Sequence, residues 1–565
     1  MSLALSTVAC SDMMDESSPN QMRPVDFYET LDDTDRSLTS TYNALYNHNV
    51  LSIEASTLCS DMGYPGYGRI GNPKNLTLAS YYNQSYSNSA DFITNKWSAL
   101  YTGVFRANQT IEALDYVVSL GNATVESDEY IRQMSQARFL RGLYHFYLHT
   151  IFNKGNIIYF DFVPEGDEFY QPLTDSDTVI ANIREDLQYA YANLPAKYDN
   201  VKDLGRVTKG AAATILALSY IYNDDGSGAC WNDAMPILED IINNYDYKLA
   251  SADVLFTAAH GEHTSESIFE ICYSAKLKPE LNENEEHSLT NRLGITCTTG
   301  SFTLSAWLLN AYQEEYKEID DTNVINKVMN DDGTTRLRTG ATRRHSAMIA
   351  SVTDEDTPYY LNPSTTSKVI VSDKTAVGYY RKYTNWDIVS DETDAGEGKK
   401  KSGKNVVVNR LSEIYLLYAE GLLKRDNDVA GALVYINKIR TRWGLKPLVE
   451  TDYTAATLMD RIMYIEKPLE LSAEGHFIRF VDLRRWGIMK SNFEKLATEV
   501  YYLHTYDPIL PSLKTKKKAH LKPESEGTTT FKIEDYREAA SNFNDSKAWW
   551  PIPLVEEQNN PNLYK

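Results

Sequence analysis

Residues 398–405 are the stretch whose spacing comes nearest to a nucleotide-binding motif. They read Gly-Lys-Lys-Lys-Ser-Gly-Lys-Asn, close to the Gly-x4-Gly-Lys-[Ser/Thr] loop that cradles phosphates. Asn405 stands where that loop needs a hydroxyl for magnesium. The flanking sequence predicts neither a strand before the loop nor a helix directly after it. We therefore interpret the segment as a solvated, lysine-rich hairpin.

Two histidines three positions apart, His260 and His263, are the nearest approach to a metal-binding motif. Zinc hydrolases use His-Glu-x-x-His on a helix, whereas this segment reads His-Gly-Glu-His and has no helical periodicity. We find no nucleophile elbow and no EF-hand loop. The chain has 78 Asp and Glu residues, so a carboxylate pair at any spacing says nothing about glycoside hydrolysis. The sequence predicts no catalytic residue, no bound metal and no cofactor.

The composition indicates a large globular protein with an acidic surface. Its 565 residues, 42% hydrophobic and 24% charged, can form one large core or two to three ordinary ones. A net charge of −22 argues against nucleic acid as a partner, because it repels phosphate backbones. Tyrosine is frequent, with 40 residues against 17 Phe and 8 Trp. Its ring and hydroxyl suit surfaces that stack and hydrogen-bond a ligand, but we expect most of the tyrosines to be partly buried between helices.

The five cysteines are too scattered for a disulfide framework or a zinc site. Cys10 is the informative one, because an apolar stretch ending in small residues precedes it and a polar tether follows it. This pattern resembles a bacterial lipoprotein processing site. We expect residues 1–9 to be a residual signal peptide, Cys10 to be lipidated and residues 10–24 to be the tether. The alternative is an ordinary free cysteine. No other segment approaches the roughly 20 apolar residues of a membrane span, so any membrane attachment is expected to be through lipid.

Helical periodicity dominates the chain. Apolar residues recur every three or four positions in the segments 137–151, 209–222, 231–242, 411–422 and 429–439. A turn at residues 425–428 separates the last two segments, and its Asp and Asn residues can cap the new helix. We expect two antiparallel helix pairs of roughly 34 residues each, the period of tetratricopeptide repeats. Ala217 and Ala419 would lie where the helices touch.

Stretches of another character interrupt these helices. Residues 60–90 are rich in Gly, Pro, Tyr and Asn and indicate a loop, while residues 318–405 mix charged loops with short β-type runs at 368–371 and 378–383. We predict a mainly α fold, with a tetratricopeptide-like helical scaffold and a loop-rich, mixed irregular half carrying small β elements. A single domain would span 25–565, with scaffold at 25–59, 90–272 and 405–497 and elaborations at 60–89, 273–404 and 498–548.

Several motifs in a fixed order carry a family resemblance. They lie at residues 97–108, 137–146, 410–420, 436–442, 470–475, 482–487, 551–553 and 560–563. Together they resemble the SusD/RagB family of starch-utilisation-type outer-membrane lipoproteins, over nearly the whole chain. The sequence departs from the family pattern at Lys467-Pro468, where an Arg is usual, and at His476, where Arg commonly follows the glycine.

Within these motifs we assign most side chains to the scaffold. The spacing of Arg410, Glu413 and Glu420 suits ion pairs across a helical turn. Four aromatic residues are expected in the core rather than at a ligand: Trp97, Tyr101, Tyr144 and Trp486.

The resemblance implies a non-catalytic, surface-exposed protein that is lipid-anchored to the outer membrane. Such a protein captures an oligosaccharide or polysaccharide and delivers it to a TonB-dependent, SusC-like outer-membrane transporter. The resemblance leaves the cargo open, so peptide capture on the same architecture is one alternative. A surface glycoside hydrolase is an alternative of another class. The ligand residues lie in variable loops and cannot be carried over from the family.

We place the ligand site in the loop at residues 61–69 and the connection after it. A pyranose has an apolar C–H face and a rim of hydroxyls, so its site needs rings to stack on and polar groups around them. Arg69 would hold hydroxyls or a uronic carboxylate. The rings would come from Tyr64, Tyr67, Tyr82 and Tyr86, and Asn291 and Arg292 would close the site from the other side. The alternative is that the tyrosines fasten a long loop to the scaffold.

Overall fold

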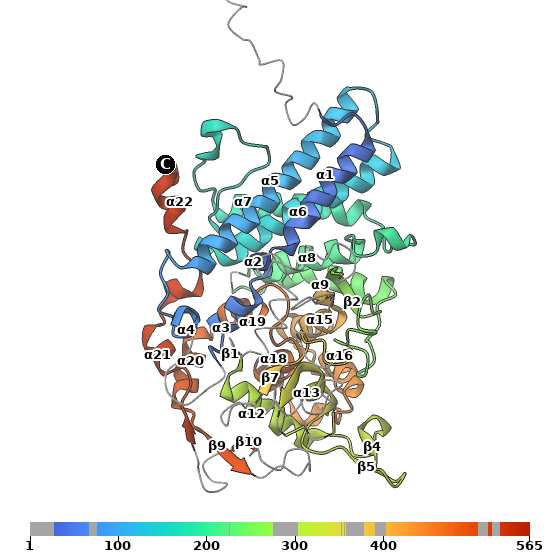
Figure 1. Cartoon of the computed structure of the whole chain (residues 1–565), viewed down its shortest axis with the longest axis vertical. Helices are drawn as coiled ribbons and strands as arrows, with labels where there is room; N and C mark the ends of the chain where they lie inside the picture. The colour runs from blue at the N-terminus through green and yellow to red at the C-terminus, as the bar shows by residue number, and fades with distance from the viewer. Residues whose placement is uncertain are drawn as a thin grey trace, which may run out of the picture.

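The structure, a computed structural model, is mainly helical with short antiparallel strand pairs (Figure 1), which confirms the predicted fold class. It describes residues 27–66, 76–224, 226–274, 303–351, 353–354, 356–357, 378–389, 403–506, 518–522 and 531–565. None of the helices in these ranges combines the length and apolarity needed to cross a membrane.

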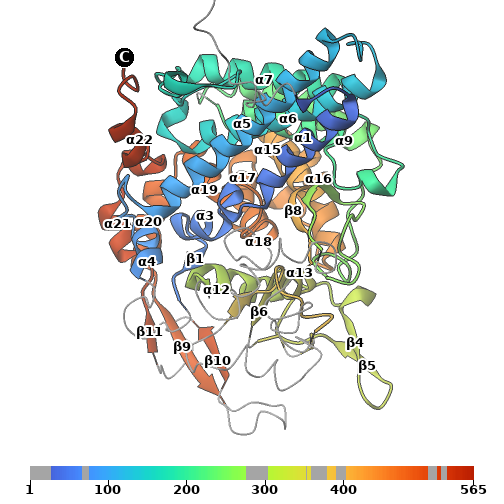
Figure 2. The same cartoon turned by 45° about the horizontal axis from the view of Figure 1, so that its top comes forward.

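A row of long helices builds one end of the molecule (Figures 1 and 2). Each helix packs against the next one along the chain, and α1 packs against both α5 and α6. The row consists of α1 (Leu31–Asn43), α5 (Asp91–Ser119), α6 (Asp128–Ile151), α7 (Ser176–Asn193), α8 (Lys209–Ile221) and α9 (Cys230–Asn244). The expected helix pair at 209–242 is therefore present as α8 and α9.

Side-chain caps fix where these helices begin. Polar side chains at the caps accept hydrogen bonds from backbone N–H groups that a helix leaves without an internal partner. Ser127, Asp175 and Thr208 cap α6, α7 and α8 in this way. Asp428 does the same for α16, accepting from the N–H of Gly431 at 2.8 Å, as the turn sequence predicts.

The second expected pair is α15 (Leu411–Asp426) with α16 (Val429–Arg442), and α15 packs directly on α9. Gly421 permits this close approach. A Cβ at this position would lie 2.1 Å from the sulfur of Met235 and 2.8 Å from the ring of Trp231, both on α9. Ala217 and Ala419 are fully buried. Small residues thus let the two helix pairs join into one tetratricopeptide-like scaffold.

Short helices and strand pairs form the opposite half of the molecule (Figure 2). The remaining helices are α2 (His48–Leu51), α3 (Ile53–Cys59), α4 (Leu76–Tyr82), α12 (Ala306–Glu314), α13 (Arg343–Met348), α17 (Ala455–Arg461), α18 (Lys467–Glu470), α19 (Ile478–Arg485), α20 (Met489–Thr498), α21 (Arg537–Asn542) and α22 (Leu554–Asn559). The strands are β1 (Gly63–Tyr64), β2 (Ser267–Ile271), β3 (Thr303–Leu304), β4 (Lys327–Met329), β5 (Thr335–Leu337), β6 (Ile349–Ser351), β7 (Gly378–Tyr380), β8 (Val406–Arg410), β9 (Tyr501–Tyr506), β10 (Lys518–Lys522) and β11 (Phe531–Ile533).

The strand pairings are all antiparallel. They are β1–β3, β2–β8, β4–β5, β6–β7 and the three-stranded order β10–β9–β11. The predicted β run at 378–383 is present as β7, and the one at 368–371 lies outside the described residues. The prediction that 60–90 is loop throughout is wrong, because this stretch contains β1 and α4. Pairing with β3 and packing on α3 stabilise elements that the local Gly- and Pro-rich composition does not favour.

The expected ion pair between Arg410 and Glu413 is wrong as well. Arg410 ends β8 and pairs with carboxylates far along the chain, while Glu413 accepts from the amide of Asn409 at 2.8 Å. Glu420 pairs with Arg485 at 2.6 Å and, across one helical turn, with Lys424 at 3.3 Å. Buried charges select whichever opposite charge the tertiary fold brings near, so helical spacing alone does not predict their partners.

The two departures from the family pattern have well-packed surroundings. Lys467 is buried and pairs with Asp482 at 2.8 Å. His476 stacks on Tyr147 with ring centroids 3.7 Å apart. Burial, together with the charges of Lys96 and Arg484, holds the pKa of His476 well below its ordinary value, so the ring is neutral at pH 7.

Candidate ligand-binding site

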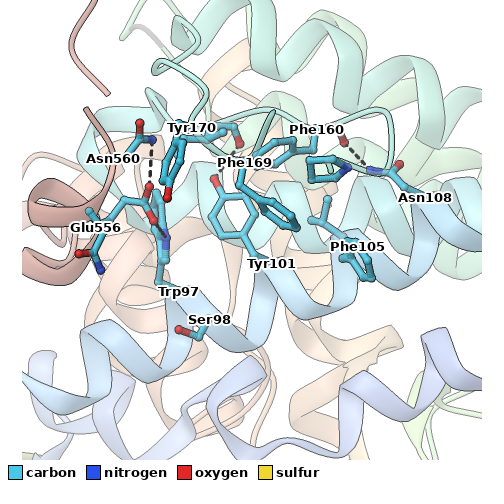
Figure 3. Close-up of a pocket in the computed structure, with 14 residues that line it drawn as sticks. Trp97, Ser98, Tyr101, Phe105, Asn108, Phe160, Phe169, Tyr170, Glu556 and Asn560 are labelled. Carbon is cyan, nitrogen blue, oxygen red and sulfur yellow. Dashed lines mark hydrogen bonds between the residues drawn. The ribbon is translucent and has the colours of Figure 1, made fainter. Parts of the chain in front are cut away.

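An aromatic cavity of about 270 Å³ lies between α5, the connection from α6 to α7, and α22 (Figure 3). Six rings line it: Trp97, Tyr101 and Phe105 from α5, and Phe160, Phe169 and Tyr170 from the connection. Trp97, Tyr101 and Phe105 follow one another at four-residue spacing, which places them along one face of the helix. Ring stacking extends across the cavity, with Phe105 and Phe169 at 6.5 Å between centroids.

Hydrogen bonds from α5 hold the connection in place over these rings. Tyr101 donates its hydroxyl to the carbonyl of Ile158 at 2.7 Å. The side-chain amide of Asn108 donates to the carbonyls of Phe160 and Phe162 at 3.0 and 2.9 Å. Arg141 of α6 in turn donates to the Asn108 side-chain oxygen at 3.2 Å. The wall that carries the cavity's outer rings is therefore fixed to the scaffold at several points.

The C-terminal segment supplies a polar wall opposite. Trp97 donates its indole N–H to Glu556 at 3.3 Å, and Asn560 donates to the same carboxylate at 3.0 Å and to the carbonyl of Gln171 at 2.9 Å. Glu556 is half-buried and Asn559, also lining the cavity, is exposed. Burial and the nearby Glu556 carboxylate raise the pKa of Tyr101 well above its ordinary value, so its hydroxyl stays protonated.

The outer rings of this cavity remain accessible. Phe169 is 49% exposed and Tyr170 is 38% exposed, whereas Trp97 is 4% exposed. Accessible ring faces beside a carboxylate, amides and the hydroxyl of Ser98 are the combination that a sugar ring needs, with apolar C–H groups on one face and hydroxyls at the rim. The cavity can bind and orient a saccharide unit.

The sequence placed this site elsewhere, and three of its predicted tyrosines are buried. Tyr64, Tyr82 and Tyr86 are 6%, 6% and 2% exposed. Tyr82 contacts Tyr64 at 5.4 Å and Tyr536 at 4.9 Å between ring centroids, and Tyr86 donates its hydroxyl to the carbonyl of Lys547 at 3.2 Å. In this structure Tyr82 and Tyr86 fasten their segment to the C-terminal part of the chain, and Tyr64 packs on Tyr82, which is the alternative considered for these tyrosines.

The other predicted ligand residues, Tyr67, Arg69, Asn291 and Arg292, lie outside the described residues, as does Cys10. Their roles stay predictions. The structure therefore brings Tyr64 and Tyr82 together but does not place the rest of the predicted site relative to them.

The sequence predicts that Trp97 and Tyr101 lie in the core, and it gives no signal for Phe169 and Tyr170. Trp97 is indeed buried, but Tyr101 is half-buried and lines the cavity. Tyr144 is fully buried, whereas Trp486 is half-buried and donates its indole N–H to Glu420 at 2.7 Å. The four-residue spacing of Trp97, Tyr101 and Phe105 was available in the sequence, but a ring stripe on a helix usually marks core.

One arrangement has the order of a nucleophile, a base and an orienting acid. The sulfur of Cys272 lies 3.8 Å from Nε2 of His263, whose Nδ1 lies 3.6 Å from Glu270. Burial, Glu270 and Glu262 raise the pKa of the Cys272 thiol to about 12, the opposite of what a cysteine nucleophile needs. A Cβ on Gly205 would lie 2.4 Å from this sulfur, so backbone also covers it. We conclude that this thiol is not an activated nucleophile.

The other two motifs singled out in the sequence are the lysine-rich segment 398–405 and the pair His260 and His263. Lys404 is not solvated as expected but buried, and it donates to the carbonyl of Thr384 at 2.9 Å, so it is a structural lysine. Among the described residues, no group of three or more His, Cys, Asp or Glu side chains is placed to hold a metal ion.

Two family models match this chain. The model described as "SusD family" matches residues 265–565, and the one described as "Starch-binding associating with outer membrane" matches residues 12–221. The chain belongs to the SusD family, as the motif resemblance predicts. Neither description is that of an enzyme.

Individual relatives share this architecture at low sequence identity. The SusD-like protein P25 of Formosa agariphila is 24% identical over 517 residues, which cover 86% of this chain and 89% of the relative. The crystal structure of a SusD superfamily protein from Bacteroides vulgatus superposes with a TM-score of 0.67 at 20% identity, covering 95% of this chain and 98% of the other. A laminarin-binding SusD-like protein gives a TM-score of 0.59 at 21% identity, covering 83% and 94%.

Proposed function

We propose that this chain is a non-catalytic glycan-binding component of an outer-membrane import complex. In this proposal it captures an oligosaccharide or polysaccharide at the cell surface and delivers it to a TonB-dependent, SusC-like transporter. The supporting observation is SusD-family membership across most of the chain, together with a solved relative that binds laminarin. The aromatic cavity supplies chemistry suited to such a ligand.

Within this proposal the aromatic cavity on α5 is a sugar subsite. A pyranose ring would stack on Phe169 and Tyr170, and Glu556 would accept hydrogen bonds from its hydroxyls. The loop site with Tyr67, Arg69, Asn291 and Arg292 is proposed as a second one, since a polysaccharide is long enough to engage two regions.

Phe169→Ala and Tyr170→Ala are expected to weaken binding of the cognate glycan by about 5- to 150-fold, the loss of 1–3 kcal/mol that one stacking ring supplies. A glycan array identifies the ligand, and calorimetry on the full chain measures its affinity. Phe27→Ala is the matched control, because this ring is 65% exposed and lies outside the cavity. Parent-like affinity in both variants, with unchanged thermal melts, would place the sugar elsewhere, and Tyr67→Ala and Arg69→Ala then test the loop site.

Two further assays separate the alternatives: a binding screen of glycans against peptides, and incubation with polysaccharides followed by detection of new reducing ends. Binding of peptides in preference to glycans would identify the ligand as a peptide captured on the same architecture. New reducing ends after incubation with polysaccharides would establish the glycoside hydrolase instead. The high pKa of the Cys272 thiol does not bear on a hydrolase that uses two carboxylates, so this assay is needed.

Membrane attachment and the transporter partner form one further prediction. Mass spectrometry of the native protein is expected to show acylated Cys10, because small residues precede this cysteine and a polar tether follows it. Several acyl chains on one cysteine would hold the protein stably on a membrane. A mild-detergent pull-down should recover a TonB-dependent transporter bound through the extended helical face. An unmodified Cys10 in the protein made from the native precursor would contradict the lipid anchor. Recovery of this protein alone, under conditions in which other membrane complexes survive, would contradict the transporter partner.

A further inference from the structure

A second cavity, of about 410 Å³, lies in the half of the molecule opposite the long helices. The segment 252–257, the β4–β5 hairpin, α13 and the region of Trp386 enclose it. Four cationic side chains line it: Lys327, Arg338, Arg343 and Arg381. The α5 cavity is lined by rings, amides and the Glu556 carboxylate, so the two cavities differ in the chemistry they offer.

Arg338 has an unused donor in this cavity's wall. It is 2% exposed, and its guanidinium donates through one terminal nitrogen to Ser346 at 2.6 Å and Thr357 at 2.9 Å, with Asp354 at 3.4 Å. Its Nε–H is buried and has no hydrogen-bond partner in the part of the chain that the structure describes. Burial and the nearby Arg343 lower the pKa of Arg338, which reflects incomplete neutralisation of its charge. An anion in the cavity would lie beside this incompletely neutralised charge.

The carboxylates around the cavity already have partners. Asp354 accepts from the hydroxyl of Ser346 at 2.6 Å as well as facing Arg338. Asp356 accepts from Arg336 at 3.0 Å. Asp253 pairs with Arg343 at 2.6 Å, but it is 68% exposed and water screens its charge. Among the described residues, these three carboxylates therefore compensate the charges of Arg338 and Arg343 only in part.

An aromatic surface accompanies these cations. The guanidinium of Arg381 lies over the ring of Trp386, with its carbon 3.3 Å from the ring centroid. Trp386 is half-buried and lines the cavity. Arg343 is 27% exposed and is aimed by its hydrogen bond to the carbonyl of Ile325 at 2.8 Å. Planar guanidinium groups match the oxygens of a carboxylate or a sulfate, while an indole ring suits the C–H face of a sugar.

We propose that this cavity binds the anionic group of an acidic saccharide, a uronic carboxylate or a sulfate ester. Arg338 and Arg343 hold the anion, and Trp386 contacts the sugar ring. This inference rests on the proposed glycan-binding function and specifies a class of glycan for it.

Calorimetry on the full chain tests this with three sets of oligosaccharides of equal length: uronic, sulfated and neutral. We expect at least one acidic set to bind more tightly than the neutral set, with an affinity that falls as salt rises. Arg343→Gln is expected to weaken the acidic ligand about 10-fold or more, the share of one charged hydrogen bond, and to leave neutral ligands unchanged. Trp386→Leu should weaken the same ligand without changing the salt dependence.

Arg36→Gln is the matched control for net charge, because Arg36 is 76% exposed on α1 at the far end of the molecule (Figure 1). Binding of the uronic or the sulfated set alone identifies which anion the cavity takes. Acidic ligands that bind no more tightly than neutral ones, or that bind folded Arg343→Gln and Trp386→Leu like the parent, overturn the inference while glycan binding stands. Absence of binding to all three sets, and to the glycan array, would instead reject the proposed function.

Discussion

Arg410→Met is expected to lower the free energy of unfolding by about 3–5 kcal/mol, the cost of leaving buried carboxylates without their cation. Arg410 is 1% exposed, and its three partners Glu266, Glu470 and Glu474 are 0–6% exposed. Chemical denaturation at pH 7 measures this change.

The geometry explains the size of the effect, because the guanidinium uses all five of its donors. Nε donates to Glu474 at 2.7 Å, and one terminal nitrogen donates to Glu266 at 2.8 Å and Glu470 at 2.7 Å. The other terminal nitrogen donates to the Glu470 carbonyl at 2.6 Å and to Glu474 at 3.1 Å. Methionine would fill part of the space but replace none of these bonds.

Neighbouring cations limit the loss. Glu266 and Glu470 keep Arg442 at 2.7 and 2.5 Å, and Glu474 keeps Lys382 at 2.6 Å. Burial raises the pKa of Glu470, but Arg442, Arg410 and Arg344 outweigh it and lower that pKa to about 2. Adding Glu474→Gln to Arg410→Met should therefore restore part of the stability, because the double variant removes one positive and one negative charge from the network.

Arg425→Met, near the end of α15, the helix that follows Arg410, is the control. Arg425 is 34% exposed and pairs at 2.7 Å with its neighbour Asp426, so its loss should change stability by no more than about 1 kcal/mol. A cost for Arg410→Met as small as for Arg425→Met would mean that the buried network contributes little to the free energy of unfolding.

This network shows what the sequence could and could not predict. The motif from 410 to 420 can be recognised from the sequence alone. Apolar periodicity also predicts the helices at 411–426 and 429–442. The partners of Arg410 lie 60 to 144 residues away. Nothing local distinguishes them among 78 acidic residues, because the choice is made by tertiary packing.

The candidate sites show the same limit. The composition of the tyrosine-rich stretch after residue 60 predicts a ligand site there. In the structure, however, Tyr82 and Tyr86 pack against residues beyond 530. The exposed rings of Phe169 and Tyr170 belong to the connection from α6 to α7. They line the candidate site because α5 and α22 lie opposite this connection. Whether a ring is open or buried depends on contacts between distant segments, which composition does not report.

Glu413→Gln is expected to stabilise the protein at pH 8.5 by about 3 kcal/mol, because at this pH the folded protein must bury an ionised Glu413 carboxylate, which burial disfavours. Burial, reinforced by Asp482 and Glu474, raises the pKa of Glu413 to about 7. The hydrogen bonds agree with a neutral carboxyl group. Asn409 donates its side-chain amide N–H to one Glu413 oxygen. Among the described residues, the other Glu413 oxygen and the Asn409 side-chain oxygen are both buried and have no hydrogen-bond partner.

A proton on Glu413 would let these two oxygens bond to each other and close an amide–acid ring, and glutamine can make the same ring. Because the folded pKa lies above the unfolded value of about 4.5, the contribution of the neutral group is complete below pH 4.5 and is lost as pH rises through 7. The stabilisation by Glu413→Gln should therefore shrink to below about 1 kcal/mol at pH 5. Urea unfolding at both pH values measures the difference, with Glu126→Gln, at an exposed position, as the control. A glutamine variant that is equally destabilised at both pH values would show that the fold does not raise the pKa of Glu413.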